Sequence, residues 1–427
     1  MNMVVKIRRR SQCEWAIVYA IFFPFLFGLL IDGLGLPSAV KYTIDIMWLF
    51  LLLVLGLNHF RMPHTEGRRL LRVAVTFFAV SMVGAFAAFQ SPLYYLWGFR
   101  NNFRFFVVFF ACVAYLRREH AQRYLEALDW LFYLNFFVAI FQYFVMGYSQ
   151  DRLGGIFGVH VGSNATTVVF FSIVMAKSVL CLMNNRESIW KCGLKCVMAL
   201  VISVFAELKV FFLMMLAIVV FSALITRFSF KKLAIFFFSL VAVFIGAKLM
   251  ERVFSNWENW FSLERIWFTL VSENGYTGAG DINRLTGIPI AWKRFLTTWP
   301  KRLLGLGLGN CDTSSFAFLN TPFYKRYNYL HYNWFSLPFL FLETGILGLA
   351  CYLAFFIRLY FQAAGASARR IDSQLARVMV MVCFIMIVYN QSLRTEAGYM
   401  VYFVLALPFM GSAEKHDRKE GDEKNEP

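Results

Sequence analysis

A histidine followed by two polar residues opens the segment 331–356, HYNWFSLPFLFLETGILGLACYLAFF, which then becomes apolar over a length that could cross a membrane. The imidazole of His331 could act as a general base toward a hydroxyl group. It could equally satisfy a backbone group at the start of the helix that follows. Glu343 lies about 18 Å of helix further in, too far to orient His331 directly. We therefore expect Glu343 and Asn333 to have structural roles near the site.

Three basic residues are predicted on the same side of the membrane as His331. They are Arg284 in DINRLTGIP, Lys209 in FAELKVFF and Arg152 in the glycine-rich stretch DRLGGIFGVHVGSN. Such cations could bind phosphate groups. Glu207 and Lys209 interrupt a long apolar run, where charged residues usually face a cavity or each other. A turn whose two charges neutralise each other explains that pair as well, and Arg152 is also compatible with an ordinary loop charge or a phospholipid contact.

The composition indicates the class of protein. The chain of 427 residues is 59% hydrophobic and 16% charged, whereas soluble proteins average about 45–50% apolar and about 25% charged residues. Repeated apolar runs near the length of a bilayer core predict an all-α polytopic membrane protein with about twelve spans. The predicted spans are 14–32, 43–59, 73–89, 103–116, 124–147, 165–183, 193–206, 210–226, 233–250, 334–357, 376–389 and 399–411.

The basic residues are distributed according to this topology. With the N-terminus inside, each inner connection carries three or four Lys and Arg residues, whereas each short outer connection carries one. This asymmetry places both termini in the cytoplasm. It also accounts for the net charge of +17 without a nucleic-acid partner. The segment 14–32 has no small-residue cleavage site behind it and is interpreted as a retained span, not a signal peptide.

The predicted organisation has four parts. Residues 1–250 hold spans one to nine, 251–333 form a large extracytoplasmic helical loop, 334–411 hold spans ten to twelve, and 412–427 form a disordered cytoplasmic tail. In the loop, 257–270 has the spacing of a helix lying at the membrane interface, and a second helix kinks or begins at Pro289. The glycines of LLGLGLGN lack the strand and acid of a dinucleotide site, so they predict a close-packed loop.

Three stretches together resemble the O-antigen ligase and polymerase superfamily. The segment from His331 resembles the family's His followed by a span with Glu-x-Gly-x-x-Gly-Leu. RLTGIPIAWKRFLTTWPKRLLGLGLGN resembles the family segment in which an Arg precedes Trp, Pro and a Gly-x-Gly-x-Gly turn. DRLGGIFGVHVGSNA is similar to its Arg-x-x-Gly-x-Phe…Asn turn. The order of these stretches, the twelve spans and the late loop match the family across most of the chain.

The resemblance implies a metal-independent glycosyltransferase of the GT-C type, without a cofactor, whose donor is a glycan on polyprenyl diphosphate. It implies that His331 deprotonates the acceptor hydroxyl and that Arg284 and a second cation bind the diphosphate. Lys209 stands where the family usually has Arg in a Ser-Arg-Gly context, and Lys offers a compact charge in place of a bidentate fork. Arg152 is assigned to the diphosphate as well, and Glu207 to a structural role.

The favoured function is therefore a polysaccharide polymerase at the outer face of the bacterial cytoplasmic (inner) membrane, acting in O-antigen, capsule or exopolysaccharide synthesis. Its acceptor would be another lipid-linked repeat. The alternative is an O-antigen ligase, whose acceptor is a lipid A core or a protein. A membrane transporter or flippase is a further alternative, although it would predict internal repeats and charges near the midplane, which the sequence does not display. Expected partners are the polyprenyl-diphosphate-linked oligosaccharide and the lipid bilayer, with a chain-length regulator and a flippase as further candidates.

Overall fold

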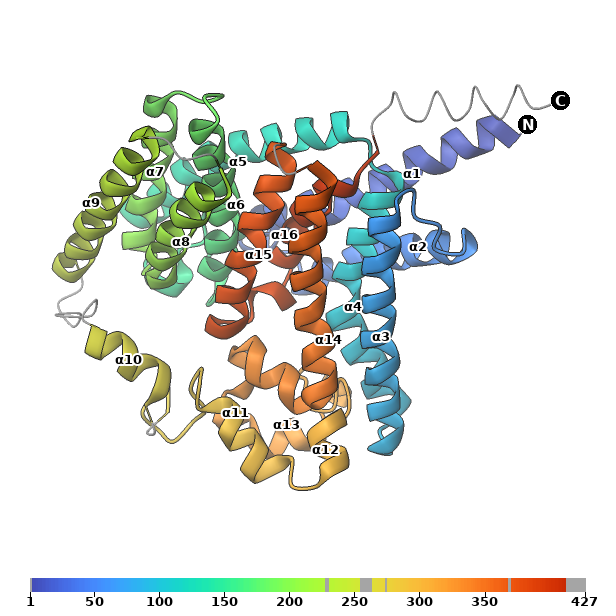
Figure 1. The fold of residues 1–427 in the computed structure, drawn as a ribbon. Coiled ribbons are helices and arrows are strands. Elements are labelled where there is room, and N and C mark those ends of the chain that lie inside the picture. Colours follow the sequence, from blue (N-terminus) through green and yellow to red (C-terminus); the bar gives the residue numbers. More distant parts are fainter. Residues whose placement is uncertain (1, 227–229, 254–262, 273–274, 368–369, 412–427) are drawn as a thin grey trace.

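The structure is a computed structural model that describes residues 2–226, 230–253, 263–272, 275–367 and 370–411 (Figure 1). Within these ranges the regular structure is helical, and the only β contact is an isolated bridge between Arg117 and Gly411. The prediction of an all-α protein is confirmed. The predicted tail 412–427 and residues 257–262 of the predicted interfacial helix lie outside the described residues.

Each predicted span overlaps one helix of the described chain. The first expected span is interrupted at Pro24, where a helix loses a backbone donor, and it continues as a 3₁₀ turn, Phe23–Leu26, and a π turn, Gly28–Gly33. The overlapping helices are α1 (Asn2–Phe22), α2 (Thr43–Leu57), α3 (Thr65–Ala87), α4 (Pro92–Tyr115), α5 (Arg118–Phe144), α6 (Ser163–Met183), α7 (Ile189–Phe205), α8 (Lys209–Ile225), α9 (Phe230–Val253), α14 (Ser336–Ser367), α15 (Ile371–Tyr389) and α16 (Ala397–Ala406).

Among the described helical segments, six are long and apolar enough to cross a membrane. Three shorter apolar segments accompany them, Lys209–Ile225, Phe237–Leu249 and Ala397–Phe409. Large apolar side chains such as Leu53, Phe86 and Trp130 are more than half exposed, as expected for surfaces that face lipid. These are features of a membrane protein. The six long segments are Ser38–Leu57, Thr65–Ala87, Arg118–Phe144, Ser163–Met183, Ser336–Gly365 and Ile371–Tyr389.

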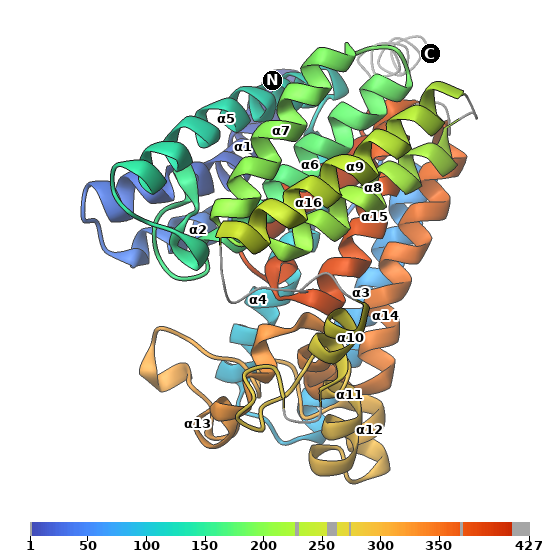
Figure 2. The same cartoon turned by 90° about the vertical axis from the view of Figure 1, so that its left-hand side faces the viewer.

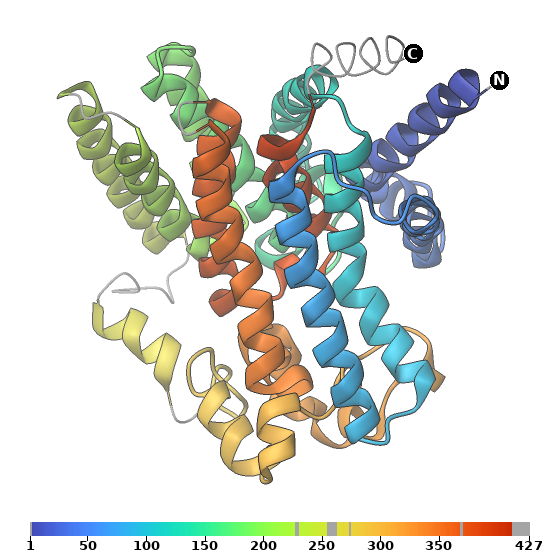
Figure 3. The ribbon, with the colours of Figure 1, turned by 45° about the vertical axis from the view of Figure 1, so that its right-hand side comes forward.

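The helices between α9 and α14 gather at the end of the molecule away from the N-terminus. They are α10 (Leu263–Val271), α11 (Gly287–Ile290), α12 (Trp299–Leu304) and α13 (Pro322–Tyr327), and Figure 2 shows them below the bundle of long helices. The long α14 rises from this region and packs against α3 on one side and α15 on the other (Figure 3). The region that carries Arg284 and His331 therefore packs on the bundle through α14 and, by way of α12, through α3.

The helix expected between Leu285 and Trp299 is broken in the structure. It begins at Gly287, with Pro289 in its first turn, where the missing backbone donor costs little. It continues as the π turn Ala291–Phe295 and ends at Leu296. Thr298 is extended, and α12 then starts at Trp299 with Pro300 in its first turn. The chain leaves the helical conformation at Leu296 and Thr298, and the apolar spacing alone did not reveal this break.

Candidate active site

His331 lies between two short 3₁₀ turns, Asn328–Leu330 and Tyr332–Trp334, and has a left-handed backbone with φ of 50°. This conformation is unfavourable for a residue with a side chain and needs support from its surroundings. The backbone N–H of Ile282 donates to the carbonyl of Leu330 at 2.9 Å. The Trp334 ring stacks on the imidazole, with centroids 3.9 Å apart. The ring is thus held in place while its side chain stays 33% exposed.

The buried partner of His331 is Asp281. Its Oδ2 lies 3.2 Å from Nδ1 of His331, and its side chain is fully buried. Its other oxygen, Oδ1, accepts the backbone N–H of Thr277 at 3.0 Å, so the carboxylate is fixed independently of the histidine. A carboxylate at Nδ1 favours the tautomer that carries its hydrogen there, which leaves Nε2 as a proton acceptor. Asp281 was not identified from the sequence.

Arg284 lies three residues after Asp281 and is only 3% exposed. Its guanidinium lies over three aromatic rings, 4.1 Å from the centroid of Tyr389, 4.6 Å from Tyr276 and 5.0 Å from Phe335. Its Nε donates to the carbonyl of Tyr389 at 3.1 Å. A cation removed from water interacts more strongly with an anion than a solvated one does. Arg284 is therefore a desolvated cation held by side chains from three segments of the chain.

Aromatic residues connect His331 to Arg284. Trp334, which stacks on His331, meets Tyr276 edge-on at 6.0 Å. Tyr276 lies against the Arg284 guanidinium, and its ring also meets that of Phe335, with centroids 5.6 Å apart. The predicted base and one predicted cation are therefore parts of a single local structure, although they are far apart in the chain.

Lys209 and Glu207 form the turn between α7 and α8. Glu207 has a positive φ of 55°, and its Oε1 lies 2.7 Å from Nζ of Lys209, with both side chains 14% exposed. The pair therefore matches the expectation of a turn whose charges compensate each other. Arg284 nevertheless acts electrostatically on Lys209, and Glu207 and Arg284 both act on Tyr389. The turn thus borders the Arg284 side of the site.

Arg152 lies in an exposed 3₁₀ turn, Gln150–Arg152, and lines a polar pocket of about 480 Å³. The preceding residue, Asp151, accepts a hydrogen bond from Nδ2 of Asn164 at 3.0 Å, and the same amide donates to the carbonyl of Ala206 at 3.1 Å. The Arg152 turn is therefore tied to the turn that carries Lys209. Among the contacts of the described residues, none joins Arg152 itself to Arg284 or His331.

Glu343 and Asn333 lie outside this arrangement of charges. Glu343 is fully buried in α14, and its Oε1 accepts the backbone N–H of Cys311 at 3.0 Å. Its carbonyl accepts the N–H of Gly307 at 3.0 Å, and a side chain at Gly305 would overlap the Glu343 backbone. The glycine-rich loop is thus packed tightly on α14, and this is consistent with a structural role for Glu343. Asn333 is half-buried in the turn Tyr332–Trp334, next to His331.

A second charged cluster, which was not identified from the sequence, lies at the middle of α4. Arg104 lies 3.7 Å from Glu396, and its Nη2 donates to the carbonyl of Arg394 at 3.2 Å. Arg394 in turn lies 3.5 Å from Asp312, which also accepts from Nδ2 of Asn101 at 2.6 Å. The sequence feature that could have indicated this cluster is the pair Arg100 and Arg104 in FRNNFRFF, at the start of a predicted span.

This cluster also perturbs the acid Glu396, which precedes α16. Burial by itself would raise the pKa of its carboxyl group. The charges of Arg104, Lys41 and Arg100 outweigh burial and lower that pKa. The carboxyl group is therefore held ionised beside the arginines, and the cluster connects α4 to the turn before α16.

The arrangement of His331, Asp281 and Arg284 is compatible with acid–base chemistry on a phosphorylated substrate. A histidine oriented by a buried carboxylate can accept a proton from a hydroxyl group. A desolvated arginine, with a lysine nearby, can stabilise negative charge on a phosphorylated leaving group. No protein-family model matches the chain, and no curated protein matches its sequence.

Proposed function

We propose that this chain is a metal-independent glycosyltransferase of the O-antigen ligase and polymerase type that acts as a polysaccharide polymerase. The observation that carries the proposal is the assembly of Asp281, His331 and Arg284 into one unit through the Trp334 and Tyr276 rings. Transfer of a glycan from a diphosphate to a hydroxyl group requires a base for the hydroxyl and a cation for the diphosphate, held in a fixed relation to each other.

In the proposed reaction, the acceptor is a sugar hydroxyl of a second lipid-linked repeat. Its oxygen forms a bond to the anomeric carbon of the donor glycan, and its proton passes to Nε2 of His331. The bond between that carbon and the diphosphate oxygen breaks, and the polyprenyl diphosphate leaves with the bonding electrons. Arg284 and Lys209 stabilise the charge that gathers on it. Asp281 stabilises the imidazolium that forms.

The proposed setting is the bacterial cytoplasmic membrane, with twelve spans, both termini inside and residues 251–333 outside. Its support is the excess of basic residues in the predicted inner connections, together with the position of α10 to α13 at the end of the molecule away from the N-terminus (Figure 1). The donor and acceptor would reach the site from the outer leaflet. A chain-length regulator and a flippase are the proposed partners.

The test replaces the gene in its own cells with His331→Ala and separates the surface polysaccharide by size. The matched control is His59→Ala, an exposed histidine in the connection between α2 and α3, and a blot checks that each variant is expressed. A ladder that collapses to single repeats in His331→Ala supports the polymerase. Long chains that accumulate unattached indicate the ligase instead. An unchanged ladder rejects the catalytic role of His331 and favours a transporter.

A further inference from the structure

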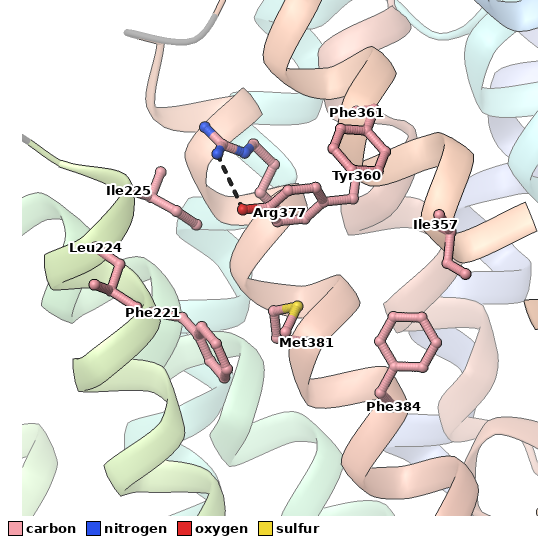
Figure 4. Close-up of a pocket in the computed structure, with 9 residues that line it drawn as sticks. All are labelled: Phe221, Leu224, Ile225, Ile357, Tyr360, Phe361, Arg377, Met381 and Phe384. Carbon is pink, nitrogen blue, oxygen red and sulfur yellow. Dashed lines mark hydrogen bonds between the residues drawn. The ribbon is translucent and has the colours of Figure 1, made fainter. Parts of the chain in front are cut away.

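A groove of about 370 Å³ lies between α8, α14 and α15 (Figure 4). α15 packs against both other helices and contributes residues between them. Leu224 on one wall and Phe361 on the other are 74% and 68% exposed, so the groove opens sideways on the surface of the helix bundle. Its lining is apolar except for Tyr360 and one cation: Phe221, Leu224, Ile225, Ile357, Tyr360, Phe361, Arg377, Met381 and Phe384.

Two of the helices that form the groove are candidate membrane spans, so we infer that the groove lies within the bilayer. The segments Ser336–Gly365 and Ile371–Tyr389, which supply α14 and α15, are both long and apolar enough to span a membrane. The open side of the groove therefore faces acyl chains. Arg377 lies six residues after the start of α15, about 9 Å along the helix. This is the depth from which a long arginine side chain reaches the phosphate level of the near leaflet.

Arg377 has no acidic partner among the described residues. Its Nη2 donates to the hydroxyl of Tyr360 at 3.1 Å, and its guanidinium lies 4.7 Å from the Tyr360 ring centroid. Its Nε is buried without a hydrogen-bond partner in the described part of the chain. Asp372, on the same helix, is already paired with Arg118 and Arg370, each at 3.3 Å. A cation beside lipid that lacks a counter-ion favours an anionic ligand.

We propose that this groove binds an anionic phospholipid of the bilayer. One acyl chain lies along the apolar residues of α8 and α15, and the phosphate pairs with Arg377, with Tyr360 as a second polar contact. The site is separate from the candidate active site, because Tyr389, which contacts Arg284, lies twelve residues further along α15, about 18 Å away. The bound lipid therefore joins α8 to α14 near the start of α15, away from Tyr389. It is not the glycan donor.

The test uses the full chain purified in detergent and compares retention of phosphatidylglycerol and phosphatidylcholine with identical acyl chains by native mass spectrometry. The wild type should retain phosphatidylglycerol preferentially. Arg377→Gln keeps a donor for Tyr360 but removes the charge, and it should bind phosphatidylglycerol about tenfold more weakly. The matched control is Arg358→Gln on α14, an exposed arginine outside the groove lining, which should leave retention unchanged.

A second variant tests the groove without touching the charge. Ile357→Trp fills the groove from the α14 wall and should displace the lipid while Arg377 is intact. Equal retention of the two phospholipids by the wild type overturns the proposal, as does an equal loss in Arg377→Gln and Arg358→Gln. Preferential retention of a polyprenyl phosphate that is lost in both Arg377→Gln and Ile357→Trp would assign the groove to the lipid carrier and overturn it too.

Discussion

Asp281 and His331 meet at 3.2 Å between Oδ2 and Nδ1, although fifty residues separate them in the chain. The contact is set by backbone pairing, because the N–H of Ile282 donates to the carbonyl of Leu330 and so brings the two neighbouring residues together. The carboxylate is buried and the imidazole is partly exposed. This orientation presents Nε2, the nitrogen away from the acid, as the one available to a substrate.

Replacing Asp281 by Asn should lower kcat for glycan transfer with little change in KM. The amide keeps the shape of the carboxylate but no longer stabilises the imidazolium in the transition state. Because general-base catalysis contributes about 10²–10⁴-fold, we expect a loss within this range that does not exceed the loss in His331→Ala. The measurement is initial rate against acceptor concentration with purified enzyme and a lipid-linked repeat.

Asp281→Glu is the companion variant, and it should recover part of the lost kcat. A structural role for Asp281 would instead lower the thermal stability of Asp281→Asn and leave kcat per folded molecule unchanged. Circular dichroism melts in detergent separate the two cases. Unchanged kcat in a stable Asp281→Asn protein contradicts the proposed orientation of His331.

Arg284→Lys should be strongly impaired even though it keeps the charge. The planar guanidinium lies over the Tyr389, Tyr276 and Phe335 rings and donates to the Tyr389 carbonyl, and an ammonium group cannot reproduce both contacts. By comparison with the loss of one transition-state donor, we expect kcat to fall about 10²-fold. The measurement is release of polyprenyl diphosphate from the lipid-linked donor.

The control for Arg284 is Arg294→Lys. Arg294 also lies over aromatic rings, those of Phe295 and Tyr327, but it is exposed and has no contact with His331 or Arg284 among the described residues. Arg294→Lys should retain wild-type activity. If both variants lose activity equally, stacking supports the fold of the loop, and the specific role of Arg284 is wrong.

The long helices were predictable because each apolar run is a local signal, and so was the close packing of the glycine-rich loop. The breaks at Pro24 and after Phe295 were not predicted. The surroundings of Arg284 were not, because Tyr276, Phe335 and Tyr389 come from three separate segments. The ion pair of Arg104 with Glu396 likewise joins α4 to the turn before α16. A single sequence reports periodicity along the chain, but it does not report which distant carboxylate a folded histidine will meet.

The Glu207–Lys209 pair gives a prediction that separates two interpretations of the same turn. If Lys209 binds the donor, Glu207→Gln should keep or improve the apparent affinity for the donor, because the lysine loses a competing carboxylate 2.7 Å away. Lys209→Gln should weaken donor affinity about tenfold. The measurement is the KM for the lipid-linked donor in each variant.

A purely structural pair predicts a different pattern. Both single variants would then lower the melting temperature by similar amounts, because each removes one side of the same ion pair at 2.7 Å. The double variant Glu207→Gln, Lys209→Gln would recover stability and would be active. An active double variant with the wild-type KM would remove Lys209 from the diphosphate site and leave Arg284 as its cation.

Acid should destabilise the protein in part through Glu396. Its pKa is lowered in the folded state, so its ionised form stabilises the fold at any pH above its ordinary pKa of 4.5. That contribution declines as the pH falls from 4.5 through the lowered value, where the carboxyl group binds a proton and the pairing with Arg104 is lost.

Melting temperatures measured in detergent from neutral to acidic pH should therefore fall less steeply below pH 4.5 in Glu396→Gln than in the wild type, from a lower starting value. Glu264→Gln, at an exposed acid of α10, is the control and should follow the wild-type curve. Parallel curves for Glu396→Gln and the wild type would show that the arginine cluster is stable without this carboxylate.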